Sequence, residues 1–237
     1  MALDLSLISA HDIIRQRHAD QQDVIQIFAA PLSQLNTREL EEARLMLLDS
    51  LFESNSDSLT GGISYAHYHL PILMCATEPA HATPLLQAWT RSGLFLSYNL
   101  VLLVPESADP SCLAPLLEAT PDAINHLCLR SLERNEAQLL MEAVTTYLPV
   151  QEPHLYLSLQ ASDTQLLEAM ASGLLGLSLY PRLGLRDGHN GFLLEGLQPR
   201  TLAFQLIDLL EDPERDWEIL QEIAQRGQQM ARRELRS

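Results

Sequence analysis

The chain has 237 residues, of which 46% are hydrophobic, so it can bury a sizeable core in one large domain or in a medium domain with an appendage. Its formal net charge of −16 at pH 7 argues against nucleic acid and anionic membrane surfaces as main partners. All 15 basic residues are arginines, because the sequence contains no lysine.

Cysteine usage and the first residues indicate the compartment. Cys75, Cys112 and Cys128 form no Cys-x-x-Cys pair, and an odd, sparse count is typical of reduced thiols. Residues 1–12 carry an acid at position 4 and no basic region, unlike a signal peptide. No apolar run approaches the ~20 residues that a membrane span needs. We therefore expect a soluble cytoplasmic protein.

Residues 1–62 have the pattern of an N-terminal extension. A short strand is predicted at 23–31, a helix at 36–52, and a polar linker at 54–62. Asn36 with Glu39 three residues later indicates a capping box. The helix carries an apolar stripe of Leu40, Leu47, Leu48, Leu51 and Phe52. Two roles follow for the extension: it associates with a second copy of the chain, giving a homo-oligomer, or it folds back on its own domain.

Residues 63–237 show a regular alternation. Short apolar runs at 70–76, 99–105, 124–130, 154–160 and 174–180 alternate with helical segments, and two further helices, broken at Asp212 and Pro213, end the chain. Continuous apolar strands alternating with helices predict a Rossmann-like parallel sheet with helices on both faces. Ligands bind such sheets at the carboxyl ends of the strands. The loops after Cys75, Pro105, Arg130 and Gln160 are therefore the places to seek a site.

Three motifs occur in order in the second half of the chain. They are Glu-Ala-Met-Ala-Ser-Gly at 168–173, Asp-Gly-His-Asn-Gly-Phe-Leu at 187–193 and Leu-Glu-Asp-Pro at 210–213. Their order and spacing resemble the signature of the retaining family-4 glycosyltransferases of GT-B architecture. The resemblance runs from about residue 68 to the end and covers that family's C-terminal, donor-binding domain. Residues 1–62 are too short for its N-terminal, acceptor-binding domain.

The resemblance implies roles for individual positions. Glu168 matches the glutamate that binds the nucleotide ribose. Gln160 stands where the family has a glutamate that contacts the donor sugar. Asp163 stands at a glycine that approaches the diphosphate, and Ala76 and His81 stand at the arginine and lysine that neutralise it. Glu168 thus keeps the family's residue, whereas Gln160, Asp163 and the pair of Ala76 and His81 differ from it. Without the arginine and the lysine, the negative charge that develops as a nucleoside diphosphate leaves loses its electrostatic stabilisation.

Other candidate ligands are weaker. Arg130 and Arg134 follow a different strand and are candidates for the missing cation. Ser162 and Asp163 precede the helix of Glu168 and would cap it. Ser162 and Thr164 are candidate contacts to a nucleotide-sugar donor. His67 and His69 have the spacing of a metal pair on a strand, but no third ligand is evident, so we expect no metal and no cofactor.

The sequence supports three hypotheses about function. The first is a glycosyltransferase-like module with a degenerate nucleotide-sugar site, which acts in protein association or regulation with a partner protein or a second copy. The second is an active subunit of a split glycosyltransferase that uses Arg130 or Arg134. The third is a sensor that binds a nucleoside diphosphate sugar without catalysis. The charge around Glu168 separates them, because cations there would favour the second and third hypotheses.

Overall fold

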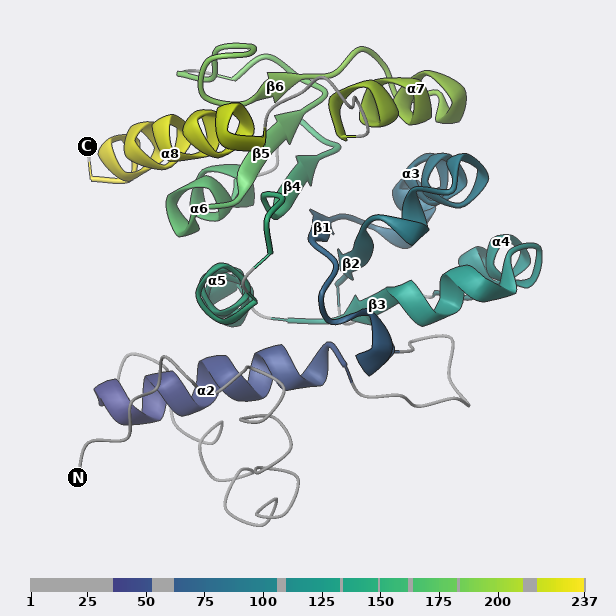
Figure 1. Ribbon diagram of the computed structural model, residues 1–237, viewed down its shortest axis with the longest axis horizontal. Coiled ribbons are helices and arrows are strands. Elements are labelled where there is room, and N and C mark those ends of the chain that lie inside the picture. The colour runs from purple at the N-terminus through teal and green to yellow at the C-terminus, as the bar shows by residue number, and fades with distance from the viewer. Residues whose placement is uncertain are drawn as a thin grey trace.

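The computed structural model describes residues 36–52, 62–105, 110–132, 134–148, 150–161, 164–182, 184–210 and 217–236. Its centre is a six-stranded sheet with the order β3-β2-β1-β4-β5-β6, in which all neighbouring strands are parallel (Figure 1). The strands are β1 (Ile72–Ala76), β2 (Asn99–Leu103), β3 (Leu127–Arg130), β4 (Leu155–Ser158), β5 (Leu175–Ser178) and β6 (Phe192–Leu193). The predicted fold class is confirmed.

Five strands lie within the five predicted apolar runs, and two details differ. The third run begins as a 3-10 helix, Pro121–His126, and becomes a strand only at Leu127. Proline fixes φ and lacks an N–H, so it suits the first turn of a helix and not the inside of a sheet. The sixth strand, β6, was not predicted, because two residues are too few to give an alternating or continuous apolar pattern.

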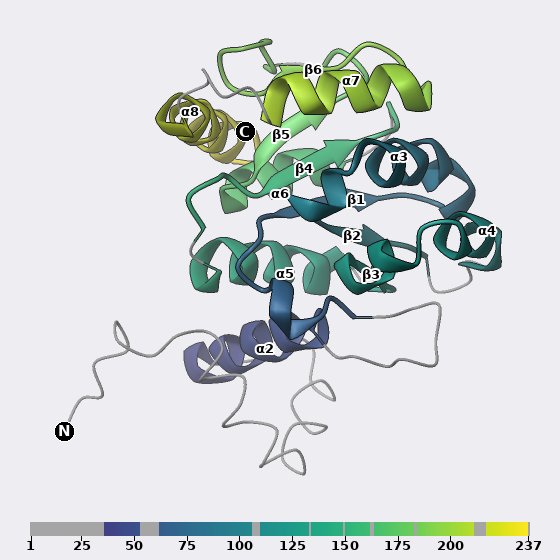
Figure 2. The ribbon, with the colours of Figure 1, turned by 45° about the vertical axis from the view of Figure 1, so that its right-hand side comes forward.

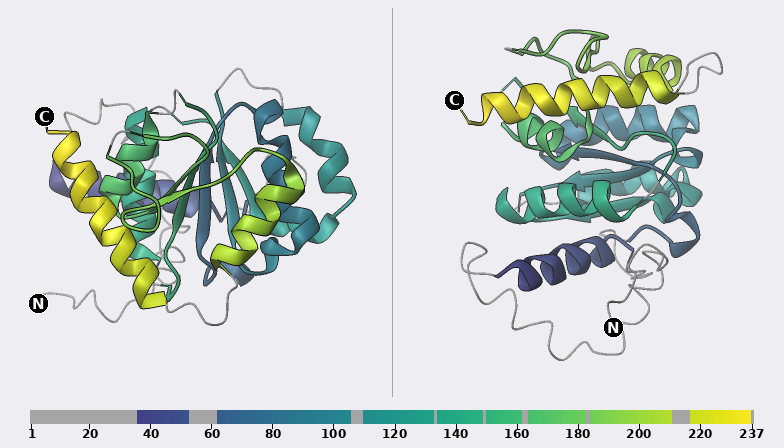
Figure 3. Two further views of the ribbon diagram at one scale, coloured as in Figure 1. Left: turned by 90° about the horizontal axis from the view of Figure 1, so that it is seen from above. Right: turned by 60° about the vertical axis from the view of Figure 1, so that its left-hand side comes forward.

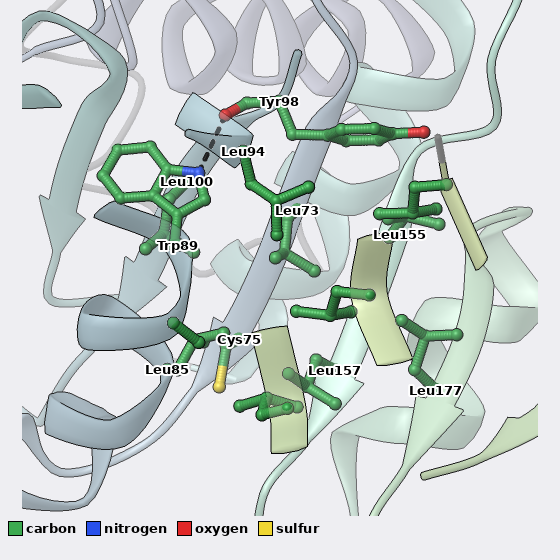
Figure 4. Close-up of a cluster of buried hydrophobic side chains, with 14 of the residues drawn as sticks. Leu73, Cys75, Leu85, Trp89, Leu94, Tyr98, Leu100, Leu155, Leu157 and Leu177 are labelled. Carbon is green, nitrogen blue, oxygen red and sulfur yellow. Dashed lines mark hydrogen bonds between the residues drawn. The ribbon is translucent and has the colours of Figure 1, made fainter. Parts of the chain in front are cut away.

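The sheet is buried on both faces, and successive side chains of β1 alternate between them. Leu73 and Cys75 join one hydrophobic cluster, whereas Ile72 and Met74 join the other. Figure 4 shows part of the first cluster, where Trp89 Nε1 donates a hydrogen bond of 3.0 Å to the carbonyl of Tyr98. Because both faces of the sheet are buried, the strand sequences are continuous apolar runs.

Helices cover both faces, as the views in Figure 3 show. The first cluster includes residues of α3 and α7, and the second includes residues of α5 and α6. The helices are α2 (Thr37–Ser50), α3 (Pro79–Ser92), α4 (Ala114–Glu118), α5 (Arg134–Tyr147), α6 (Gln165–Ser172), α7 (Pro199–Leu210) and α8 (Trp217–Glu234). Within the described ranges, none of them combines the length and apolar composition needed to cross a membrane.

The capping box at the start of α2 is confirmed. The Asn36 side chain accepts hydrogen bonds from the backbone of Arg38 and Glu39, at 3.0 and 3.1 Å, and the Glu39 carboxylate accepts one of 2.7 Å from the Asn36 backbone. Three backbone donors at the helix end are thereby satisfied. The predicted strand at 23–31 and the linker at 54–62 lie outside the described residues, apart from Gly62.

Helix α2 packs on α5 of its own chain, on the outer side of the sheet's second helical layer (Figure 2). Leu48, Leu51 and Phe52 are fully buried there, and the Phe52 ring stacks on Tyr65 at 5.9 Å. The stripe of this helix is therefore occupied within the protomer. Of the two roles expected for the extension, α2 shows folding back on its own domain. Self-association through its apolar stripe does not fit this structure, because the stripe is already buried within the protomer.

Arg44 links α2 to α5, and its removal should weaken this docking. Its guanidinium pairs with Glu41 at 2.8 Å and with Glu142 of α5. Because these side chains are partly exposed, we expect Arg44→Ala to lower the free energy of unfolding by only about 1 kcal/mol. Urea denaturation measures this. Arg38→Ala is the control, since that side chain is 89% exposed and its ion pair in the described part of the chain is with Glu42 of the same helix. Equal losses in both variants would contradict the assignment.

Candidate functional site

The strand order reverses between β1 and β4, and this switch point is where open α/β sheets bind ligands. The loop after β1 leads into α3, whose first turn carries His81, and the loop after β4 carries Gln160. The Gln160 amide and His81 Nδ1 lie 3.0 Å apart, within hydrogen-bond distance. Two positions that the resemblance assigns to sugar and phosphate contacts are thus brought together, and they bond to each other across the switch point.

Glu168 lies in the first turn of α6 and is only 8% exposed. One of its carboxylate oxygens accepts hydrogen bonds from Nε of Arg134, at 2.7 Å, and from the Nη2 of the same guanidinium. Arg134 is the first residue of α5, and its contact with Glu168 raises the pKa of the guanidinium. The carboxylate that the resemblance assigns to the ribose therefore already has an internal cationic partner.

A further cation, Arg182, lies in the loop after β5 and was not predicted. Its Nη2 donates to Ser158 Oγ at 3.1 Å and to the Gln160 carbonyl at 2.8 Å, so the guanidinium sits at the carboxyl end of β4. Its Nε is buried without a hydrogen-bond partner among the described residues. The sequence signal was present, because Arg182 lies two residues after the fifth apolar run, but that loop was not among those singled out.

The remaining candidates differ in where they lie. Arg130 ends β3, two strands away from β1, and its guanidinium donates to Ser50 of α2 at 3.4 Å and to the Leu129 carbonyl at 3.1 Å. Thr164 is exposed and precedes α6 without a side-chain capping bond. Ser162 and Asp163 lie outside the described residues. Ala76, at the aligned arginine position, ends β1 as a partly buried residue.

The two histidines His67 and His69 do not lie on a strand, which corrects the expectation for them. His67 belongs to a 3-10 helix, Tyr65–His67, and its ring stacks on His126 at 3.8 Å between centroids. Burial and the nearby His67 lower the pKa of His126 to about 4. Within the described ranges, no three His, Cys, Asp or Glu side chains are grouped so as to hold a metal ion.

No protein-family model and no curated protein sequence match the chain. Solved structures do match. The C-terminal domain of a group 1 glycosyl transferase (LpcC) from Francisella tularensis aligns with 78% of this chain and 96% of its own length, at 16% identity and a TM-score of 0.51. The chain has the fold of a GT-B glycosyltransferase C-terminal domain.

Longer proteins share the same fold over part of their length. Sucrose-phosphate synthase from Thermosynechococcus elongatus has 12% identity and a TM-score of 0.51, covering 89% of this chain and 60% of the enzyme. The GtfA/B complex has 19% identity and a TM-score of 0.51, covering 70% of this chain and 33% of the matched one. At these identities the likeness establishes the fold, and the site must be judged from its own residues.

Proposed function

We propose that this chain is a glycosyltransferase-like module with a degenerate donor site, which acts through association with a partner protein and transfers no sugar by itself. The ion pair between Glu168 and Arg134 is the observation that carries the proposal. Both bonds from Arg134 end on one oxygen of the nearly buried Glu168 carboxylate, one of them at 2.7 Å, so a ribose hydroxyl would have only the second oxygen and a carboxylate whose charge is already offset.

The phosphate side of the site supports the same conclusion. Ala76 offers no charge, and the His81 imidazole is within hydrogen-bond distance of Gln160. Departure of a nucleoside diphosphate develops negative charge, and the loss of one preorganised donor costs ~3 kcal/mol or more in the transition state. Arg182 also lies at the carboxyl end of β4, but its Nη2 donates to Ser158 and to the Gln160 carbonyl of its own chain.

A split glycosyltransferase is the second candidate, and Arg182 is the observation that favours it. This guanidinium lies where β4 ends, so a partner chain that supplied the facing domain could redirect it to a phosphate. The GtfA/B structure is a complex that contains a chain of the same fold. Arg130 fits this role less well, since it is bonded to Ser50 of α2.

Release of free nucleotide tests the proposal. The purified chain, incubated with UDP-glucose or GDP-mannose, should release UDP or GDP no faster than buffer does, because Ala76 and His81 stand at the two cation positions and Arg182 is bonded within the chain. Release well above the buffer rate that disappears in Glu168→Gln would contradict the proposal and favour a working donor site. Arg200→Gln, an exposed position on α7, serves as the matched control variant.

A further inference from the structure

A pocket of about 390 Å³ lies between the 184–190 loop and the second half of α8. Its lining residues come from these two segments alone: Gly184, Arg186, His189, Asn190, Arg226, Gln229, Met230, Arg233 and Glu234. None of them belongs to the loops after β1 or β4, so the pocket is separate from the site described above. Pockets of this size are large enough for a small organic molecule.

The walls of this pocket are fixed by internal hydrogen bonds. Asn190 is buried, accepts from the Arg186 backbone at 2.7 Å and donates to the Gly184 carbonyl at 2.8 Å, which closes the loop on itself. Arg226 Nε donates to the His189 carbonyl at 2.7 Å and ties the loop to α8. A cavity with fixed walls loses less conformational entropy when a ligand binds.

The charge of the pocket is opposite to that of the chain. Arg186, Arg226 and Arg233 line it together with one carboxylate, Glu234, in a protein with 31 acidic and 15 basic residues. Arg226 pairs with Glu222 at 3.3 Å, whereas Arg186 and Arg233 have no ion pair within the described part of the chain. Arg233 in the last turn of α8 also offsets the helix dipole, but Arg186 lies on the loop and has no such role.

We propose that this pocket binds a phosphate-bearing small molecule. Guanidinium groups match phosphate oxygens with paired, charge-assisted hydrogen bonds, and Gln229 and His189 add polar contacts. Met230 is the one large apolar side chain of the lining, which makes a purely apolar ligand a poor fit. The pocket is concave, so it accommodates a compact anion that both Arg186 and Arg233 can reach.

Calorimetry of the full-length chain with sodium pyrophosphate at low ionic strength tests the proposal. The wild type should give saturable binding that weakens as salt is added. Arg186→Gln with Arg233→Gln should weaken binding about ten-fold or more, equivalent to about 1.4 kcal/mol. The matched control, Arg91→Gln with Arg200→Gln, removes two exposed arginines elsewhere and should leave the affinity unchanged.

Three results would overturn the site. They are no saturable heat in the wild type, equal affinity in the Arg186/Arg233 double variant, and loss of binding only in Arg182→Gln, which would locate the anion at the strand ends. Urea denaturation confirms that each variant folds. If the double variant does not fold, the two single variants, each at an exposed position, must both weaken binding. The result is independent of nucleotide-sugar binding, which depends on other residues.

Discussion

Replacing Gly191 with valine should lower the free energy of unfolding by about 3 kcal/mol or more, because there is no room for a side chain. A Cβ at this position would lie 2.7 Å from the Gly176 carbonyl oxygen of β5 and 2.5 Å from a Leu185 methyl. Backbone cannot yield as a flexible side chain does, so β6 would have to move away from β5. Loss of this pairing would also displace the loop that precedes it.

Gly188 of the same loop is the matched control. It has φ of +66°, and a Cβ there would meet nothing within 4 Å. Gly188→Ala should therefore cost only the strain of a left-handed conformation, about 1–2 kcal/mol. Thermal or urea unfolding of both variants decides the matter. A Gly191→Val variant as stable as Gly188→Ala would show that β5 and β6 are less closely packed than the structure indicates.

Acidification should destabilise the fold between pH 6.5 and pH 4, chiefly through His154. This buried ring accepts a hydrogen bond from the Ile72 backbone at 3.1 Å and lies 2.9 Å from the Leu148 carbonyl, an arrangement that needs a neutral imidazole. Burial lowers its pKa from 6.5 to about 4. In this window the unfolded chain binds a proton that the folded chain does not, so stability falls as the pH falls.

The size of this effect follows from the shift. Lowering the pKa from 6.5 to about 4 corresponds to about 3 kcal/mol of stability, which is fully present above pH 6.5 and lost as the pH approaches 4. His126 contributes in the same direction, since its pKa is also lowered. Urea denaturation at several pH values measures the slope. His154→Gln should flatten it and His69→Gln should not. A slope that is unchanged in His154→Gln would contradict this account.

Much of the fold could be predicted because its physical causes are local. Strands buried on both faces read as continuous apolar runs, and the capping box of α2 needs only Asn36 and Glu39, three residues apart. The position of α2 could not be predicted. An apolar stripe shows that a helix face is buried, but not whether its partner is α5 or a second copy of the chain.

The site could be predicted less completely because its contacts are long-range. Glu168 and Arg134 are 34 residues apart, and their pairing depends on how α5 and α6 pack. The bond between Gln160 and His81 spans 79 residues and depends on β1 and β4 being neighbours. The sequence thus indicated which side chains are unusual for a donor site, whereas the structure shows the contacts of Gln160 with His81 and of Glu168 with Arg134.

A calorimetric titration of the wild-type chain with UDP-glucose and GDP-mannose tests the central claim most directly. A degenerate donor site predicts no saturable heat once Arg186→Gln and Arg233→Gln have removed the separate anion pocket. In that background it predicts a gain of affinity in the variant that combines Ala76→Arg, His81→Lys and Asp163→Gly, since an arginine and a lysine are added and one anion is removed. Absence of a gain in the folded triple variant would count against the alignment of these positions. Micromolar affinity in the wild type that survives Arg186→Gln with Arg233→Gln would contradict the account itself.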